Sequence, residues 1–307
     1  MAAKSYEVPE TLGGKALDAI VRAVLEVPWG KARTLVETGK VSVDGQVVTT
    51  SERRVRAGAT IAIDPAAPRP RPGRLDRDRI VFVDAHVVVV DKPSGVSTVP
   101  YDENETGTLD ELVRDALAAR DRSPRPSLGV VHRIDKDTSG LVVFTRSWLA
   151  KQSLSNQFRA HSTHRKYRAI VHGHALAKTY TSHLVEDRGD GLRGSIERMK
   201  GKRPPLTAGQ RAVTHVEVVE RLKGATLVSC TLETGRTHQI RIHLSEAGHP
   251  LVGERVYVRD YGADIIPAPR LMLHAAELGF VHPKTEREVR FTSPLPADFE
   301  ATLARLR

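Results

Sequence analysis

Two short segments of the sequence concentrate the residue types that could perform chemistry. The first, residues 131–144, places the cationic pair His132-Arg133 beside the carboxylate of Asp135. Thr138-Ser139-Gly140 then lead into an apolar stretch. This order is typical of a loop that brings charged side chains to the end of a buried strand. A non-catalytic interpretation stays open, because aspartates in such loops often close turns or cap helices.

The second segment, residues 232–244, is rich in cationic side chains. Within eight residues it contains Arg236, His238, Arg241 and His243. If the chain turns sharply or becomes helical after Gly235, several of these groups converge and require an anion. A phosphate and the carboxylate of Asp135 are both suitable. A metal site built from His238, His243 and His249 is disfavoured, because the spacing matches no metalloprotease helix and no acidic ligand accompanies it.

The composition indicates a polyanionic partner. Lysine and arginine number 47 and aspartate and glutamate 37, which gives a net charge of +10. Nucleic acid is the first candidate for the partner and an anionic membrane surface is the second. With 307 residues the chain suits two unequal domains better than a single core.

Cysteine and hydropathy exclude several classes of protein. Cys230 is the only cysteine and lies in an apolar run, so we expect a buried thiol and neither a disulfide framework nor a cysteine-based zinc site. No apolar stretch approaches the roughly 20 residues of a membrane helix, and the first residues lack the apolar core of a signal peptide. We therefore expect a cytoplasmic protein.

Residues 14–64 predict a small unit of two helices and a hairpin. Apolar residues recur at helical spacing over residues 15–26, a second short helix ends near Gly39, and Asp44-Gly45 separate two strand-like runs. A further strand is expected at residues 60–63. The cations that this unit offers to a polyanionic partner are Lys31, Arg33, Lys40 and the cluster Arg53, Arg54 and Arg56. The proline- and arginine-rich residues 65–78 predict a semi-rigid linker.

Residues 79–307 predict an α+β domain with a large, mainly antiparallel sheet. Helices are expected at 108–119 and 150–159 from their periodicity. The polar residues 173–209 predict long connections or a protruding hairpin. Strands are expected at 80–84, 87–91, 141–145, 167–172, 212–221, 225–233 and 290–292.

Five ordered blocks of this domain resemble the RluA family of RNA pseudouridine synthases. The family core HRLD-x-x-TSG-L is matched by HRID at residues 132–135 and TSGL at residues 138–141. Residues 14–64 are similar to the S4 domain, an RNA-binding module that many members carry. Three departures stand out: Arg165 replaces a common lysine, Glu254 a common aspartate, and Tyr257-Val258 a tyrosine-glycine pair. The other blocks are DKPSGVSTVP at 91–100, Arg165-Lys166-Tyr167, GRTHQIRIHL at 235–244, and Leu273-His274-Ala275 with His282-Pro283.

The resemblance implies an isomerase that converts uridine in RNA to pseudouridine. Asp135 matches the essential aspartate, Tyr167 the active-site tyrosine that stacks on uracil and helps remove its carbon 5 proton, and Arg241 the arginine that pairs with the aspartate. Arg133 is expected to fill the gap left by the flipped base or to contact a phosphate. Neither interpretation of Asp135 is preferred: attack on the anomeric carbon, or assistance to a glycal intermediate. His132, Arg236 and His238 are expected to contact the substrate.

The reaction needs no redox change, so no cofactor and no metal are expected. The expected partner is structured RNA, ribosomal RNA in particular and transfer RNA as a minority substrate. A monomer without a required protein partner and without membrane association is expected. Two alternatives are a non-catalytic RNA-binding or ribosome-assembly factor, which an intact Asp135-Tyr167-Arg241 set opposes, and an RNA N-glycosidase, which would release uracil.

Overall fold

The computed structural model describes residues 4–49, 51, 53–67, 74–101, 105–199 and 203–307. Its contacts divide the chain into two compact units, residues 1–72 and 73–307. The predicted linker, residues 65–78, falls partly outside the described residues, which omit 68–73. Among the described residues, no helix is long and apolar enough to cross a membrane.

The first unit packs two helices on a small sheet. The β2–β3 turn places Asp44 and Gly45 at positive φ, 50° and 80°, as the predicted two-residue hairpin requires. Leu17, Ile20 and Val36 form part of its apolar core. The sequence does not predict β1, because only Tyr6 of that polar edge strand packs on the core. The elements are β1 (Lys4–Glu7), α1 (Leu17–Leu25), α2 (Trp29–Glu37), β2 (Val41–Val43), β3 (Gln46–Val47) and β4 (Thr60–Ile63), with sheet order β1-β4-β2-β3.

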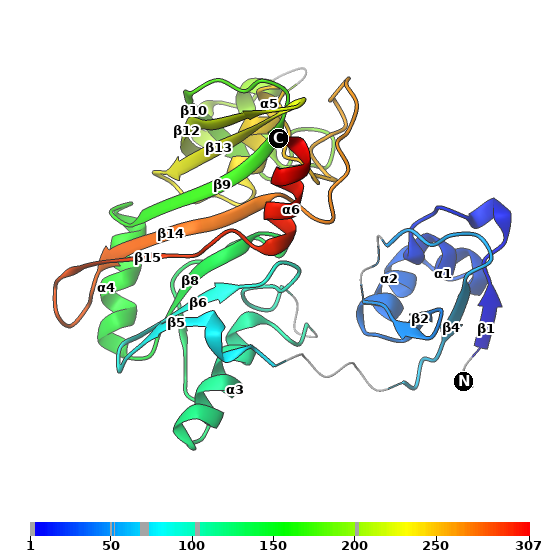
Figure 1. Ribbon diagram of the computed structural model, residues 1–307, viewed down its shortest axis with the longest axis horizontal. Coiled ribbons are helices and arrows are strands. Elements are labelled where there is room, and N and C mark those ends of the chain that lie inside the picture. Colours follow the sequence, from blue (N-terminus) through cyan, green and yellow to red (C-terminus); the bar gives the residue numbers. More distant parts are fainter. Residues whose placement is uncertain (1–3, 50, 52, 68–73, 102–104, 200–202) are drawn as a thin grey trace. The chain divides into compact units, whose positions relative to one another are not determined.

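The second unit is built on one large sheet, and the predicted α+β class with a mainly antiparallel sheet is confirmed. In order along the sheet its strands are β11 (Gly194–Ser195), β10 (Lys178–Val185), β12 (Gln210–Leu222), β13 (Ala225–Leu232), β9 (His164–His172), β14 (Leu273–Val281), β8 (Ser139–Thr145), β6 (Val87–Lys92) and β5 (Ile80–Val83). β15 (Glu288–Thr292) pairs with β14, and β7 (Gly129–Val130) pairs with β8. The β8–β14 pair is parallel. Figure 1 shows β9 and β14 side by side across the middle of the sheet.

Helices cover both faces of β8. Val142 and Phe144 face one core together with residues of α3 (Leu109–Asp121). Leu141 and Val143 face a second core together with Leu154 of α4 (Trp148–Arg159). A strand buried on both faces reads as a continuous apolar run, which is why the sequence predicts it clearly. The remaining helices are α5 (Gln239–Glu246) and α6 (Ala297–Leu306).

Two strands of the large sheet correct the sequence interpretation. Residues 173–209, where long connections or a protruding hairpin are expected, do contain an antiparallel pair, β10 with β11, but β10 also pairs with β12 and is therefore part of the sheet. The sequence KTYTSHLV is too polar for a clear strand signal. β14 was not expected either, because alanine and glycine dilute its apolar pattern. Small residues are needed there: a Cβ on Gly140 of β8 would lie 2.3 Å from the Ala275 carbonyl oxygen.

Candidate active site

The end of β6 and the segment after it hold the loop that bears Asp135 in place. Lys92 is fully buried, and its Nζ donates to the carbonyl oxygen of Lys136 at 2.8 Å. Thr98 Oγ1 donates to the carbonyl oxygen of Ile134 at 2.9 Å. The backbone on both sides of Asp135 is therefore fixed by a segment some forty residues earlier in the chain, which corresponds to the DKPSGVSTVP block.

Lys92 is an unusual anchor because it is a buried cation. Its Nζ also donates to the carbonyl oxygens of Pro93 and Val96, at 3.0 and 2.7 Å. Three carbonyl acceptors match the three donors of an ammonium group. Burial lowers the pKa of Lys92 to about 7, although the charges of Asp137 and Asp135 oppose that shift. The protonation of Lys92 is thus coupled to the loop that it holds.

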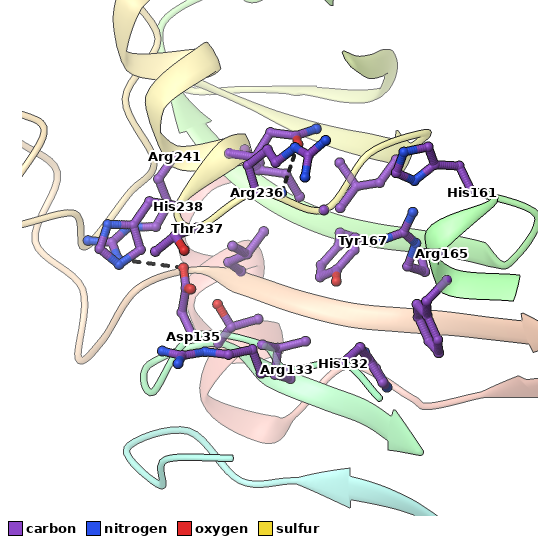
Figure 2. A pocket seen from close by; sticks show the side chains of 18 of the residues that line it. His132, Arg133, Asp135, His161, Arg165, Tyr167, Arg236, Thr237, His238 and Arg241 are labelled. Carbon is purple, nitrogen blue, oxygen red and sulfur yellow. Dashed lines mark hydrogen bonds and ion pairs between the residues drawn. The ribbon is translucent and has the colours of Figure 1, made fainter. Parts of the chain in front are cut away.

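A pocket of about 440 Å³ opens beside this loop (Figure 2). Most of its lining residues belong to the β7–β8 loop, the end of α4, β9, the turn before α5 and the start of α5. The structure therefore brings seven predicted site residues of the second unit to one cavity: His132, Arg133, Asp135, Tyr167, Arg236, His238 and Arg241.

Asp135 and Arg241 form an ion pair at one end of this pocket. Arg241 Nη1 lies 3.6 Å from Asp135 Oδ2, and the Asp135 side chain is 20% exposed. Arg241 makes closer contacts with Glu254: Nε to Oε2 is 2.7 Å and Nη2 to Oε1 is 2.8 Å. Glu254, which stands where the family commonly has aspartate, therefore contacts the arginine that pairs with Asp135.

Tyr167 on β9 lines the pocket as a buried, neutral phenol. Burial raises its pKa to about 12, and the negative charge of Asp135 adds to the shift while Arg165 opposes it. A phenolate base is therefore scarce at neutral pH. A neutral ring is compatible with the expected stacking on the uracil. If Tyr167 also helps to remove the carbon 5 proton, it must do so as a protonated phenol.

His132 is uncharged, and this corrects the cationic pair inferred from the sequence. Its ring stacks on Phe158 with a centroid distance of 4.4 Å, and its Nε2 accepts the backbone N–H of Val143 at 3.0 Å. Burial lowers the pKa of His132 to about 3, and the nearby charge of Arg165 adds to this. The ring supports the wall of the pocket, while Arg133 is the exposed cation of the pair.

The cations of the second segment do not all converge. His238 Nδ1 lies 2.7 Å from the Tyr257 hydroxyl, and burial lowers the pKa of His238 although Asp135 opposes this. Arg236 Nε donates to the carbonyl oxygen of Arg211 at 3.1 Å at the rim. His243 instead bonds Ser182 and Thr214, and burial lowers its pKa to about 4. Arg236, His238 and Arg241 thus border the pocket, and His243 is a neutral residue of the core.

Arg165 has a structural position that sequence reasoning missed. It is 7% exposed and donates through Nη2 to the carbonyl oxygen of Glu233 at 2.7 Å. A Cβ on Gly235 would lie 2.5 Å from Arg165 Nη1, so a glycine lets this loop close over the guanidinium. Gly235 is the one feature of the sequence that could have indicated this close approach of the loop to another side chain. Phe158, His161 and Thr237 also line the pocket without having been predicted.

The predicted cations of the first unit are solvent-facing or paired. Lys31 is exposed. Arg33 Nη2 lies 3.3 Å from the buried carboxylate of Asp18, and Lys40 donates to the carbonyl oxygen of Ala67. Within the described residues no group of three or more His, Cys, Asp or Glu side chains is placed to hold a metal ion.

Comparison with known proteins gives the class of this fold and site. Residues 86–246 match the family model described as RNA pseudouridylate synthase, and residues 17–61 match the S4 domain. A solved human structure, RNA Pseudouridylate Synthase Domain Containing 4, shares the fold with a TM-score of 0.59 and 23% identity, over 75% of this chain and 93% of that one.

Two curated bacterial relatives extend the similarity over nearly the whole chain. Ribosomal large subunit pseudouridine synthase D of Zymomonas mobilis is 35% identical, covering 98% of this chain and 96% of its own length. An uncharacterized RNA pseudouridine synthase of Bacillus subtilis is 36% identical, covering 93% and 92%. The chain belongs to the RNA pseudouridylate synthase family, with an N-terminal S4 domain, and is an isomerase of uridine in RNA.

Proposed function

We propose that this enzyme converts specific uridines of ribosomal RNA to pseudouridine, with Asp135 as the carboxylate that acts on the sugar. The observation that carries the role of Asp135 is its ion pair with Arg241 beside Tyr167 in one pocket. The choice of ribosomal RNA is supported by the relatives named ribosomal large subunit pseudouridine synthase D. A ribosomal RNA substrate would place the protein in the cytoplasm. We expect the protein to act as a monomer.

The reaction breaks the bond between N1 and the anomeric carbon, and its electron pair leaves with the uracil. Asp135 either forms an ester with the anomeric carbon or removes the neighbouring C2′ proton to give a glycal. The base then turns in the pocket and carbon 5 bonds to the anomeric carbon. The ester bond breaks and returns the carboxylate, or the C2′ proton is returned. The proton on carbon 5 is lost and N1 gains one, so reactant and product are isomers.

Arg241 and Tyr167 have distinct tasks in this proposal. The guanidinium of Arg241 lies 3.6 Å from the Asp135 carboxylate and orients it toward the sugar. The neutral Tyr167 ring stacks on the uracil, and its hydroxyl hydrogen-bonds the base or relays its proton. Because the target base must leave its stack to reach Asp135, the nucleotide is flipped into the pocket and Arg133 at the rim fills the gap or binds a phosphate.

The test of this assignment replaces the carboxylate and nothing else. Asp135→Asn should abolish turnover on ribosomal RNA while RNA affinity changes by less than about tenfold, or ~1.4 kcal/mol. Asp115→Asn, which changes an exposed carboxylate of α3 outside the pocket, is the matched control and should keep the rate. Readily measured turnover by folded Asp135→Asn protein would overturn the role of Asp135.

A further inference from the structure

Arg241 is held along one edge by a second carboxylate. Glu254 accepts both Nε and Nη2 of the guanidinium at 2.7 and 2.8 Å, which is the strong, two-pronged geometry of such pairs. The contact with Asp135 is made by Nη1, and its distance of 3.6 Å is longer than a hydrogen bond. The arginine therefore pairs closely with Glu254 and loosely with Asp135.

Glu254 is itself rigidly placed. Its side chain is 1% exposed, and Oε1 also accepts the backbone N–H groups of Arg255 and Val256, both at 2.9 Å. Burial raises the pKa of Glu254, but the hydrogen bonds and charge of Arg241 outweigh this and the net shift is downward. Glu254 is therefore an ionised group whose orientation is fixed by its own turn.

Two neighbouring residues, Tyr257 and Gly253, hold the Arg241–Glu254 pair in its position. The Tyr257 ring lies against the guanidinium, with 5.2 Å between the Arg241 carbon and the ring centroid. Gly253, at φ +82°, brings the turn so close to the next segment that a Cβ there would be 1.9 Å from the Arg270 carbonyl oxygen. Glu254 thus cannot follow Arg241 if the arginine turns toward Asp135.

The charges explain why this matters for the reaction. One guanidinium serves two carboxylates, and a closely paired, two-pronged carboxylate has its oxygen lone pairs engaged in hydrogen bonds. A carboxylate engaged in that way is a weaker nucleophile or base than one that is only oriented by a nearby cation. Without Glu254, the Nε and Nη2 edge of Arg241 would be free to make the same two-pronged pair with Asp135.

We propose that Glu254 is a positioning residue that holds Arg241 back from close pairing with Asp135, and so leaves the oxygens of the Asp135 carboxylate available to the sugar. This inference rests on the proposed role of Asp135. It assigns a purpose to the position at which this chain has glutamate and its family commonly has aspartate.

The experiment measures the single-turnover rate at saturating RNA and the RNA affinity of the full chain. Glu254→Gln keeps the shape and removes the charge, and its rate should fall by about ten- to a hundredfold, the scale of a small misplacement of a reacting group. RNA affinity should stay unchanged. Glu254→Asp keeps the charge and should recover most of the rate. Thermal unfolding of each variant reports whether it is folded.

A pair of variants gives a second test, which removes the charge of Glu254 in a protein that already lacks Arg241. The rates of Arg241→Gln and of Arg241→Gln with Glu254→Gln should be equal, because Glu254 acts only through Arg241. Additive losses would overturn the proposal, as would Glu254→Gln at the unaltered rate, a loss of affinity in place of rate, or no recovery in Glu254→Asp. Asp135→Asn is measured alongside: if it retains turnover the proposed function fails, whereas if only Glu254→Gln is unaffected this inference alone fails.

Discussion

The two units of this protein hold their cations in different ways. In the first unit the side chain of Arg33 is 55% exposed and Lys31 is exposed. In the second, Arg165 and Arg241 are 7% and 8% exposed and Lys92 is fully buried. Exposed cations can release counterions and bind phosphates, which gives affinity. Buried cations are already committed to protein acceptors, so they orient other groups. On this contrast we expect the first unit to hold RNA and the pocket of the second to perform the chemistry.

Within this comparison, the largest expected effect is on the reaction rate, and it comes from a substitution in the pocket of the second unit. Tyr167→Phe keeps the aromatic ring and removes the hydroxyl, so the single-turnover rate should fall by about a hundredfold while RNA affinity is retained. Tyr180→Phe, on β10 and outside this pocket, is the matched control and should keep the rate. Equal rates for both variants would leave Tyr167 with stacking alone.

A smaller effect concerns the stability of the loop that bears Asp135. Lys92→Met leaves three carbonyl oxygens without a donor, so the free energy of unfolding should fall by about 3 kcal/mol, roughly 1 kcal/mol for each. The measurement is chemical denaturation of both proteins across pH.

The pH dependence has a definite sign. Burial places the pKa of Lys92 near 7 in the folded chain against 10.5 for the ordinary group. Between these values the unfolded chain binds more protons than the folded one, so the stability that Lys92 confers rises with pH. The advantage of the unaltered protein over Lys92→Met should therefore widen from pH 7 to about pH 10. A difference that narrowed over this window would show that burial does not depress this pKa.

The smallest effect on rate is expected from the first unit. Removing residues 1–72 should change the single-turnover rate at saturating RNA little. If three phosphate contacts are lost, the slope of log affinity against log salt should flatten by about two units, since each contact contributes about 0.7 to 0.9. A salt slope identical to that of the full chain would show that this unit does not hold the RNA.

A single substitution sharpens the same comparison. Lys31→Gln should lower the salt slope by about 0.7 to 0.9 if this exposed lysine meets a phosphate. Arg33 is a poorer probe, because its loss would also leave the buried Asp18 carboxylate without its partner. Denaturation of both variants separates the two effects, with Lys31→Gln expected to be as stable as the unaltered protein.

Elements with a strong local signal were predictable from the sequence. The predicted strand at residues 60–63 matches β4 at both ends. The continuous apolar runs of β6 and β8 also predict these strands directly. β10 and β14 were not predictable, because their pattern is polar in one and interrupted by small residues in the other. Their partners decide their structure: β14 lies between β8 and β9, and contact between backbones there requires small side chains.

The site follows the same division. Asp135, Tyr167 and Arg241 could be selected through the family resemblance, and the fold places all three at one pocket. The neutrality of His132 depends on its burial against Phe158, and the hold of Glu254 on Arg241 depends on a turn thirteen residues away. Neither leaves a local signal, since both arise only when segments pack together.

The most direct measurement maps pseudouridine in ribosomal RNA from a strain that lacks this protein, before and after treatment with the purified chain. Chemical derivatisation followed by mass spectrometry distinguishes pseudouridine from uridine, which has the same mass. The account predicts that one or a few positions lack pseudouridine in this strain and regain it on treatment, without release of free uracil. Release of uracil would identify a glycosidase, and unchanged ribosomal RNA would contradict the proposed substrate.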